Sequence, residues 1–208
     1  MKRRPSIRAV LTFSLALLSL VGCSFKSETA PSRFYMLRPL PAAATSPGAP
    51  GGEAGPVLAL GPIKVAAYLD RPQIVTRAPG AEVKLSEFDR WAEPLQDNVA
   101  GVLADNLSSL VPTNRISAYP ARLPPDVDLR ITVDVTRFDG PLGGDVVLDA
   151  RWSLVSGSEE AETHMQRSHF VQPAGGPGYA DLVEAMSRAL DALSRELAQE
   201  IRRATGSN

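Results

Sequence analysis

The sequence predicts an α+β domain of two layers, in which a mostly antiparallel sheet carries two amphipathic helices packed on one face. Residues 92–110 and 179–204 repeat apolar side chains at steps of three and four, the spacing of helices with one buried face. Between them, residues 128–138 and 146–156 alternate apolar and polar side chains, as strands do when one face of their sheet is buried. Packing the helices on that face would bury both apolar surfaces.

The first 22 residues are predicted to be a signal peptide. Lys2, Arg3, Arg4 and Arg8 precede an apolar run over residues 10–20, which is the order of charge and hydrophobicity in an export signal. A helix that crosses the bilayer needs about twenty apolar residues, so this run is too short to anchor the chain by itself.

The segment after the apolar run, Leu20, Val21, Gly22 and Cys23, matches a bacterial lipobox. An ordinary export signal that ends near a cysteine is the alternative, but Cys23 is the one cysteine of the chain and stands where a lipobox requires it. We therefore expect cleavage before Cys23, lipid on its thiol, and neither a disulfide nor a cysteine nucleophile in the mature protein. Ser24, which is not an aspartate, favours sorting to the periplasmic face of the outer membrane, where several fatty chains give firm anchoring.

The mature chain is expected to be acidic. Removing residues 1–22 takes away four basic residues and no acidic ones, which leaves 18 basic and 23 acidic residues and a net charge of −5. This balance argues against nucleic acid as a partner and against electrostatic docking on anionic lipid.

The mature chain is long enough for one domain, residues 34–204, between a lipidated tether (23–33) and a short tail (205–208). Residues 39–56 consist almost entirely of Pro, Gly, Ala and Ser, so we expect a disordered loop that contributes nothing to the core. In the helix at 92–110, Asp97, Asn98, Asp105 and Asn106 are expected on the polar side. Further strands are predicted at residues 34–38, 57–65, 73–77, 82–85, 115–118 and 162–171.

The sequence contains no recognisable catalytic or metal site, and we expect no enzyme activity, no cofactor and no metal. His164 and His169 are separated by an odd number of residues in one predicted strand, so their rings should face opposite sides of the sheet and cannot form a metal pair. Residues 175–178 are rich in glycine and precede the last helix, where they could cradle an anion or simply form a turn; the turn is favoured.

Two segments combine aromatic, acidic and arginine side chains. The first contains Tyr68, Leu69, Asp70, Arg71 and Pro72 before a strand, and the second places Asp89, Arg90, Trp91 and Glu93 at the start of the first helix. As enzyme residues, Asp70, Asp89 and Glu93 would be acid–base candidates, but no nucleophile or histidine completes a site. As structural residues, Asp70 and Arg71 would pair locally, Trp91 would pack beneath the helix, and Glu93 would favour the helix dipole. As interface residues, Tyr, Trp and Arg are the types that dominate hot spots.

These segments, after a lipobox and a Phe-Tyr-x-Leu strand at residues 34–37, resemble the PqiC/YmbA family of ABC-type transport auxiliary lipoproteins. The resemblance covers essentially the whole mature chain, although residues 39–56 make a longer loop than the family pattern suggests.

The resemblance implies a non-enzymatic subunit of a membrane-integrity pathway, in which an MCE-domain (PqiB-like) tube protein carries lipids between the inner and outer membranes. It also allows a homo-oligomeric ring that meets the end of the tube. The alternative function from another class is an outer-membrane assembly lipoprotein that supports a β-barrel of the lipopolysaccharide-export type.

Overall fold

The computed structural model describes residues 30–41, 55–113, 115–119, 126–156 and 164–206. The predicted signal peptide, the predicted lipobox with Cys23, Ser24 and residues 42–54 of the predicted loop lie outside these residues. Ser32–Asn208 form one compact unit, which is the unit described below. Within the described part of the chain, no helix combines the length and the apolar character that a membrane crossing requires.

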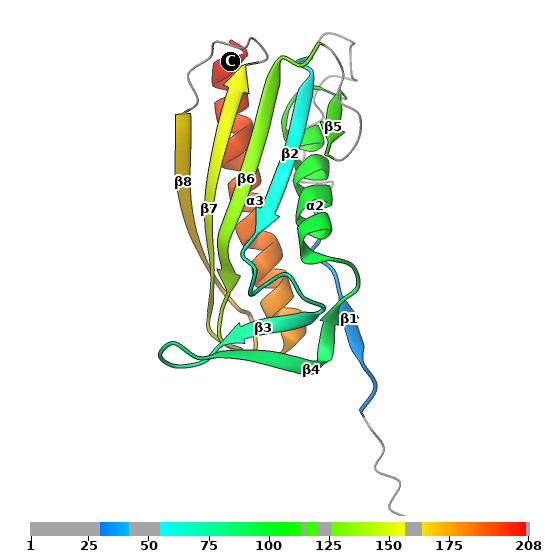
Figure 1. Ribbon diagram of the computed structural model, residues 1–208, viewed down its shortest axis with the longest axis vertical. Helices are drawn as coiled ribbons and strands as arrows, with labels where there is room; N and C mark the ends of the chain where they lie inside the picture. Colours follow the sequence, from blue (N-terminus) through cyan, green and yellow to red (C-terminus); the bar gives the residue numbers. More distant parts are fainter. Residues whose placement is uncertain (1–29, 42–54, 114, 120–125, 157–163, 207–208) are drawn as a thin grey trace, which may run out of the picture. The chain divides into compact units, whose positions relative to one another are not determined.

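The larger of two sheets has five strands in the order β5-β2-β6-β7-β8 (Figure 1). The strands β6 (Leu129–Asp139), β7 (Asp145–Ser156) and β8 (His164–Pro173) form an antiparallel meander. By contrast, β2 (Leu58–Val65) is parallel to both β6 and the short β5 (Ile116–Ala118). Two antiparallel pairs thus adjoin two parallel pairs within one sheet.

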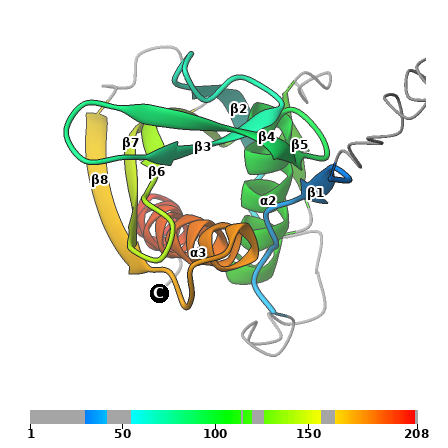
Figure 2. The ribbon, with the colours of Figure 1, turned by 90° about the horizontal axis from the view of Figure 1, so that it is seen from below.

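The smaller sheet has three strands in the order β1-β4-β3 and lies across one end of the unit, at the bottom of Figure 1. β3 (Gln73–Arg77) and β4 (Val83–Trp91) form an antiparallel hairpin, and β1 (Arg33–Tyr35) adds to β4 in parallel. Viewed from that end, the hairpin crosses in front of the larger sheet and β1 lies beside α2 (Figure 2). The smaller sheet is therefore the end at which the chain arrives from its N-terminus.

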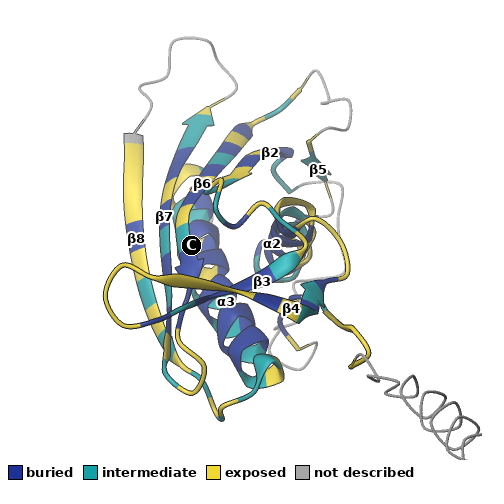
Figure 3. Ribbon diagram, turned by 60° about the horizontal axis from the view of Figure 1, so that its bottom comes forward, coloured by how far each residue is buried: buried dark blue, intermediate teal, exposed yellow. Residues whose placement is uncertain are grey.

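Two helices, α2 (Leu95–Leu110) and α3 (Tyr179–Ala204), cover the same face of the larger sheet. Their apolar faces and the inward side chains of the strands make one core, which includes the fully buried Phe138, Leu103 and Leu190. Figure 3 shows α3 largely buried, whereas β8 and the tip of the β3–β4 hairpin are largely exposed. The α+β class and the two helices on one face are thus confirmed.

The predicted sheet needs one correction, because it is mixed and divided in two rather than one mostly antiparallel sheet. Alternation along a strand reports which side chains are buried and does not report the direction of the neighbouring strand. The predicted strand at 82–85 also continues to Trp91, and α2 starts at Leu95 instead of residue 92.

Two asparagines of α2 correct the expected polar side of that helix. Asn98 and Asn106 are buried, because each side-chain oxygen accepts a backbone N–H of the segment that follows β1. Leu37 N–H donates to Asn98 Oδ1 at 2.6 Å, and Leu40 N–H donates to Asn106 Oδ1 at 2.7 Å. This N-terminal strap, residues 37–40, buries Leu37 and Leu40. Leu40 therefore contradicts the expectation that nothing in residues 39–56 fills the core.

Candidate partner-binding site

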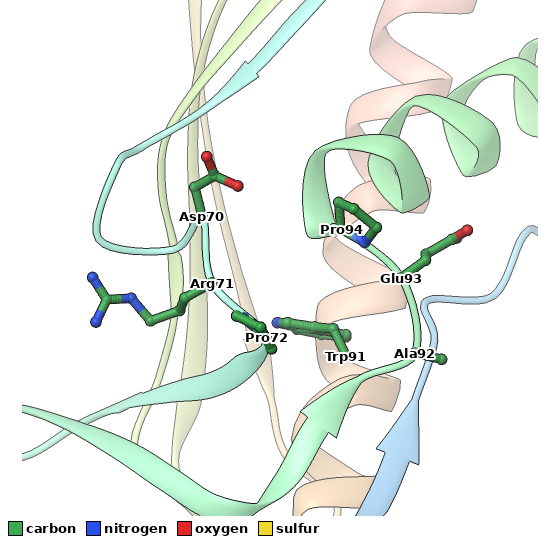
Figure 4. Close-up of a pocket in the computed structure, with 7 residues that line it drawn as sticks. All are labelled: Asp70, Arg71, Pro72, Trp91, Ala92, Glu93 and Pro94. Carbon is green, nitrogen blue, oxygen red and sulfur yellow. The ribbon is translucent and has the colours of Figure 1, made fainter.

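The two segments singled out in the sequence meet at one surface pocket of about 350 Å³ (Figure 4). Asp70, Arg71 and Pro72 reach it from the loop between β2 and β3, and residues 91–94 reach it from the link between β4 and α2. The backbone N–H of Trp91 donates to the carbonyl of Pro72 at 2.8 Å, which joins the two segments directly. Segments about twenty positions apart in the sequence therefore form one site.

Tyr68 lies outside the lining of this pocket and serves as scaffolding. Its hydroxyl donates to Asp139 Oδ2 at 2.5 Å, and Asp139 also accepts from Arg77 (2.9 and 2.7 Å) and Arg137 (3.1 Å). Burial, together with the hydrogen bond to Asp139, raises the pKa of Tyr68 to about 12. Burial alone would raise the pKa of Asp139, but the donors around it outweigh that effect and lower the pKa below its ordinary value. The neighbouring Leu69 belongs to the core.

Asp89 is also scaffolding, and it lies on β4 rather than at the start of the helix. It is buried and accepts hydrogen bonds from Arg33 Nε at 2.8 Å, Tyr35 Oη at 2.9 Å and Ser86 Oγ at 2.9 Å. Burial opposes ionisation of this carboxyl, yet these donors lower its pKa. Asp89 therefore ties β1 to β4, which leaves it unsuited to the acid–base role considered from the sequence.

Arg90 and Trp91 are likewise placed at the end of β4 and not on the helix. Arg90 donates from Nε to the carbonyl of Glu87 at 3.3 Å on the protein surface. Trp91 is 5% exposed and packs into the core below the first turn of α2, as the structural interpretation of this residue predicted.

The indole N–H of Trp91 makes no hydrogen bond to a residue that the structure describes, and its nitrogen is not fully enclosed by protein. Figure 4 shows the indole nitrogen at the end of the ring that is turned toward Pro72. The other tryptophan differs, because Trp152 Nε1 donates to the buried Ser168 Oγ at 2.8 Å. Buried indole N–H groups normally have a partner, so the N–H of Trp91 is a donor available at the pocket.

The charged side chains of the pocket form no ion pair with one another or with other described residues. Asp70 and Glu93 are exposed and form no ion pair with another described residue. The local pair between Asp70 and Arg71, which was one interpretation of the sequence, does not form within the described part of the chain. Arg71 Nε is buried and lacks an acceptor there. The two motifs thus divide into scaffolding residues and residues that remain available to a ligand.

Other features examined in the sequence give no second site. The β7–β8 ladder has no bulge between positions 164 and 169, so the backbone places these two positions on opposite faces of the sheet, and His169 pairs with Asp149 at the surface. The Asp181 carboxylate accepts the Gly178 N–H at 3.0 Å, so the protein's own acid lies at the start of α3 where an anion was considered. No three His, Cys, Asp or Glu side chains converge on a metal position in the described ranges.

Several residues that hold the site carry no signal in the sequence. Asp139 follows the strand predicted at 128–138, and its partner Arg77 ends another predicted strand, so nothing in either segment indicated that they meet. The same holds for Arg33, which the prediction placed in the tether and which the structure joins to Asp89. Contacts between residues this distant along the chain leave no periodic pattern in a single sequence.

Comparison with known proteins identifies the family. Residues 35–198 match the family described as the ABC-type transport auxiliary lipoprotein component. Over 190 residues the chain is 25% identical to the intermembrane transport lipoprotein PqiC of Escherichia coli K12, covering 91% of this chain and 96% of that protein. The protein of the same name from Shigella flexneri matches equally.

Two solved structures show the same fold. One, an uncharacterized protein, is 22% identical with a TM-score of 0.68, and the match covers 83% of this chain and 99% of that one. The other, from Xanthomonas campestris, is 16% identical with a TM-score of 0.67 and coverages of 84% and 97%. The matching family is one of transport auxiliary proteins and not of enzymes. This chain therefore belongs to the ABC-type transport auxiliary lipoprotein component family.

Proposed function

We propose that this protein is an outer-membrane-anchored periplasmic lipoprotein and an auxiliary subunit of an MCE-type intermembrane lipid transport system that maintains envelope integrity. Lipid on Cys23 holds the domain at the membrane, and an MCE-domain tube protein of the PqiB type is its partner. Copies of the lipoprotein form a ring at the end of the tube. The observation that carries the proposal is the family match together with the similarity to PqiC across nearly the whole of both chains.

The available side chains around the 350 Å³ pocket support a binding role for the domain. Tyr68 and Asp89 are committed to internal hydrogen bonds, whereas Asp70, Arg71 and Glu93 present charge beside the buried ring of Trp91. An aromatic floor with charged residues around it is the composition of an interface hot spot. We therefore place the partner contact at this pocket.

The anchoring part of the proposal is tested by membrane fractionation. The wild-type protein is expected in outer-membrane fractions, and Cys23→Ser should give an uncleaved or unanchored product. Wild-type protein in the soluble fraction would contradict the anchor. Wild-type protein in the inner membrane would contradict only the sorting inferred from Ser24.

The partner part is tested by capture of an MCE-domain protein encoded in the same genome. Arg71→Glu should change the amount of MCE protein captured while leaving the melting temperature unchanged, because Arg71 lines the pocket and forms no ion pair in the described part of the chain. The matched control is Arg130→Glu, which makes the same charge change at an exposed position of β6. Equal capture by the wild type and both variants would remove the pocket from the partner contact.

A further inference from the structure

The pocket beside Trp91 offers a defined set of unsatisfied groups. These are the indole N–H of Trp91, the buried Nε of Arg71, and the carboxylates of Asp70 and Glu93, none of which has a partner within the ranges described. The indole N–H is open to the pocket, so an occupant that supplies a carbonyl oxygen can accept a hydrogen bond from it. The occupant should therefore carry a hydrogen-bond acceptor to Trp91.

The apolar part of the pocket fits a peptide better than a lipid. Its walls are the ring of Trp91 and the two prolines Pro72 and Pro94, with the backbone of Ala92 beside them (Figure 4). A volume of about 350 Å³ is at the low end of the range for small-ligand sites, so it has no room for a phospholipid with two acyl chains. Flat aromatic and prolyl surfaces with an indole N–H suit an extended peptide, whose carbonyls point outward.

The charged side chains around the pocket indicate the charge that its occupant should carry. Asp70 and Glu93 line the pocket from its two segments, and Figure 4 shows both side chains above the Trp91 ring and the Arg71 guanidinium turned away from it. Two of the three charged side chains that line the pocket are therefore acidic, and the one basic group is directed away from the ring. A lysine or arginine could lay its aliphatic stem on Trp91 and direct its cationic group to these carboxylates.

We infer that this pocket recognises an extended peptide segment of a partner protein, which places a basic side chain, flanked by prolyl or aliphatic residues, over Trp91 and between Asp70 and Glu93. This inference rests on the proposed function in taking the pocket as the partner contact. It adds the chemistry of the partner's segment, which must be basic and extended.

The test uses two blocked peptides, Ac-Pro-Pro-Lys-Pro-Pro-NH2 and Ac-Pro-Pro-Glu-Pro-Pro-NH2, with the nitrogen-15-labelled mature chain in detergent. The spectrum contains one indole N–H signal for each of the two tryptophans, and the signal lost in Trp91→Phe identifies Trp91. The lysine peptide should shift the Trp91 signal in a saturable manner. The Trp152 signal, whose N–H is bonded internally, should stay in place. The glutamate peptide should need at least roughly fivefold higher concentration, the preference expected from exposed charges.

Charge variants separate recognition from a general effect of net charge. Asp70→Asn combined with Glu93→Gln should bring the two peptides to within about twofold of each other. The control is Glu82→Gln combined with Asp105→Asn, which removes the same charge from two exposed positions away from the pocket and should keep the preference. Melting temperatures of both double variants should match the wild type.

Three results would overturn the inference. The first is equal binding of the two peptides, and the second is a lysine preference that survives in the Asp70 and Glu93 double variant. The third is no shift of the Trp91 signal at about 5 mM peptide, a concentration at which a site with a millimolar Kd is mostly occupied. If the chain still captures an MCE protein under those results, the proposed function stands and only the peptide chemistry fails. If peptide selectivity holds but no MCE protein is captured, the proposed function fails instead.

Discussion

The hydroxyl of Tyr68 donates a 2.5 Å hydrogen bond to the completely buried carboxylate of Asp139. This contact joins the loop after β2 to the end of β6. Arg77, on β3 of the smaller sheet, also donates to the Asp139 carboxylate. The loop that carries Asp70 and Arg71 is thus fixed at its base by Tyr68. Residues that are adjacent in one sequence motif consequently have different roles, one internal and the others at the surface.

Tyr68→Phe should lower the free energy of unfolding by about 1.5–3 kcal/mol, because it removes a donor from a buried charged acceptor. Urea unfolding at neutral pH measures this loss. Arg71→Glu, three residues along the same loop, should leave that free energy unchanged. Equal losses in the two variants would show that the whole loop is scaffolding.

Acid should destabilise the fold through Asp139 and Asp89, whose pKa values are both lowered by their donors. A lowered folded pKa gives stability that is fully present above the unfolded pKa of about 3.9 and is lost as pH falls through the folded value. The free energy of unfolding should therefore drop as the pH falls from about 4 through the lowered pKa values of the two carboxyls in the folded state. Asp89→Asn should make this drop smaller, and an unchanged drop would assign the acid sensitivity to other carboxyls.

Asn98→Leu should destabilise the fold by about 1–3 kcal/mol, because it leaves the buried N–H of Leu37 without its acceptor. Hydrogen exchange at the Leu37 amide should accelerate in parallel. Gln96→Leu is the control, since Gln96 is exposed on the same helix. Similar effects of the two substitutions would mean that helix content and not the strap is responsible.

Replacing residues 42–54 with a short Gly-Ser linker should leave thermal stability nearly unchanged. This composition cannot offset the roughly 1–2 kcal/mol per residue that backbone ordering costs. The linker variant should melt within about 5 °C of the wild type. A larger decrease would show that the segment packs on the domain.

Periodicity was sufficient to predict α3, the β6–β7 hairpin and most of α2, because in each a single apolar face is repeated over many residues. Periodicity was not sufficient where a strand's direction or a side chain's burial depends on a segment far away in the sequence. The parallel pairing of β2 with β6 and the burial of Asn98 and Asn106 depend on segments far along the chain. A polar side chain that is buried to bind a backbone N–H looks, in sequence, like an ordinary surface residue.

The candidate site was predicted in part for the same reason. Both motif segments were identified, and the structure brings them together at one pocket. Sequence alone could not separate Asp89, which binds Arg33 and Tyr35, from Asp70, which has no partner among the described residues. The distinction depends on which groups lie next to each carboxylate in the folded structure.

The short parallel pairing of β1 with β4 has a mechanical consequence for a chain anchored through Cys23. Under the proposed anchoring, a load between membrane and domain reaches β1 first, and β1 is held by three residue pairs and by the hydrogen bonds of Arg33 and Tyr35 to Asp89. Detachment of Arg33–Tyr35 would lengthen the tether by about 10 Å, at roughly 3.3 Å per residue, before the strap at Leu37 bears any load. β1 would thus detach before the strap at residues 37–40 does. The domain could then move farther from the membrane while its core stays folded.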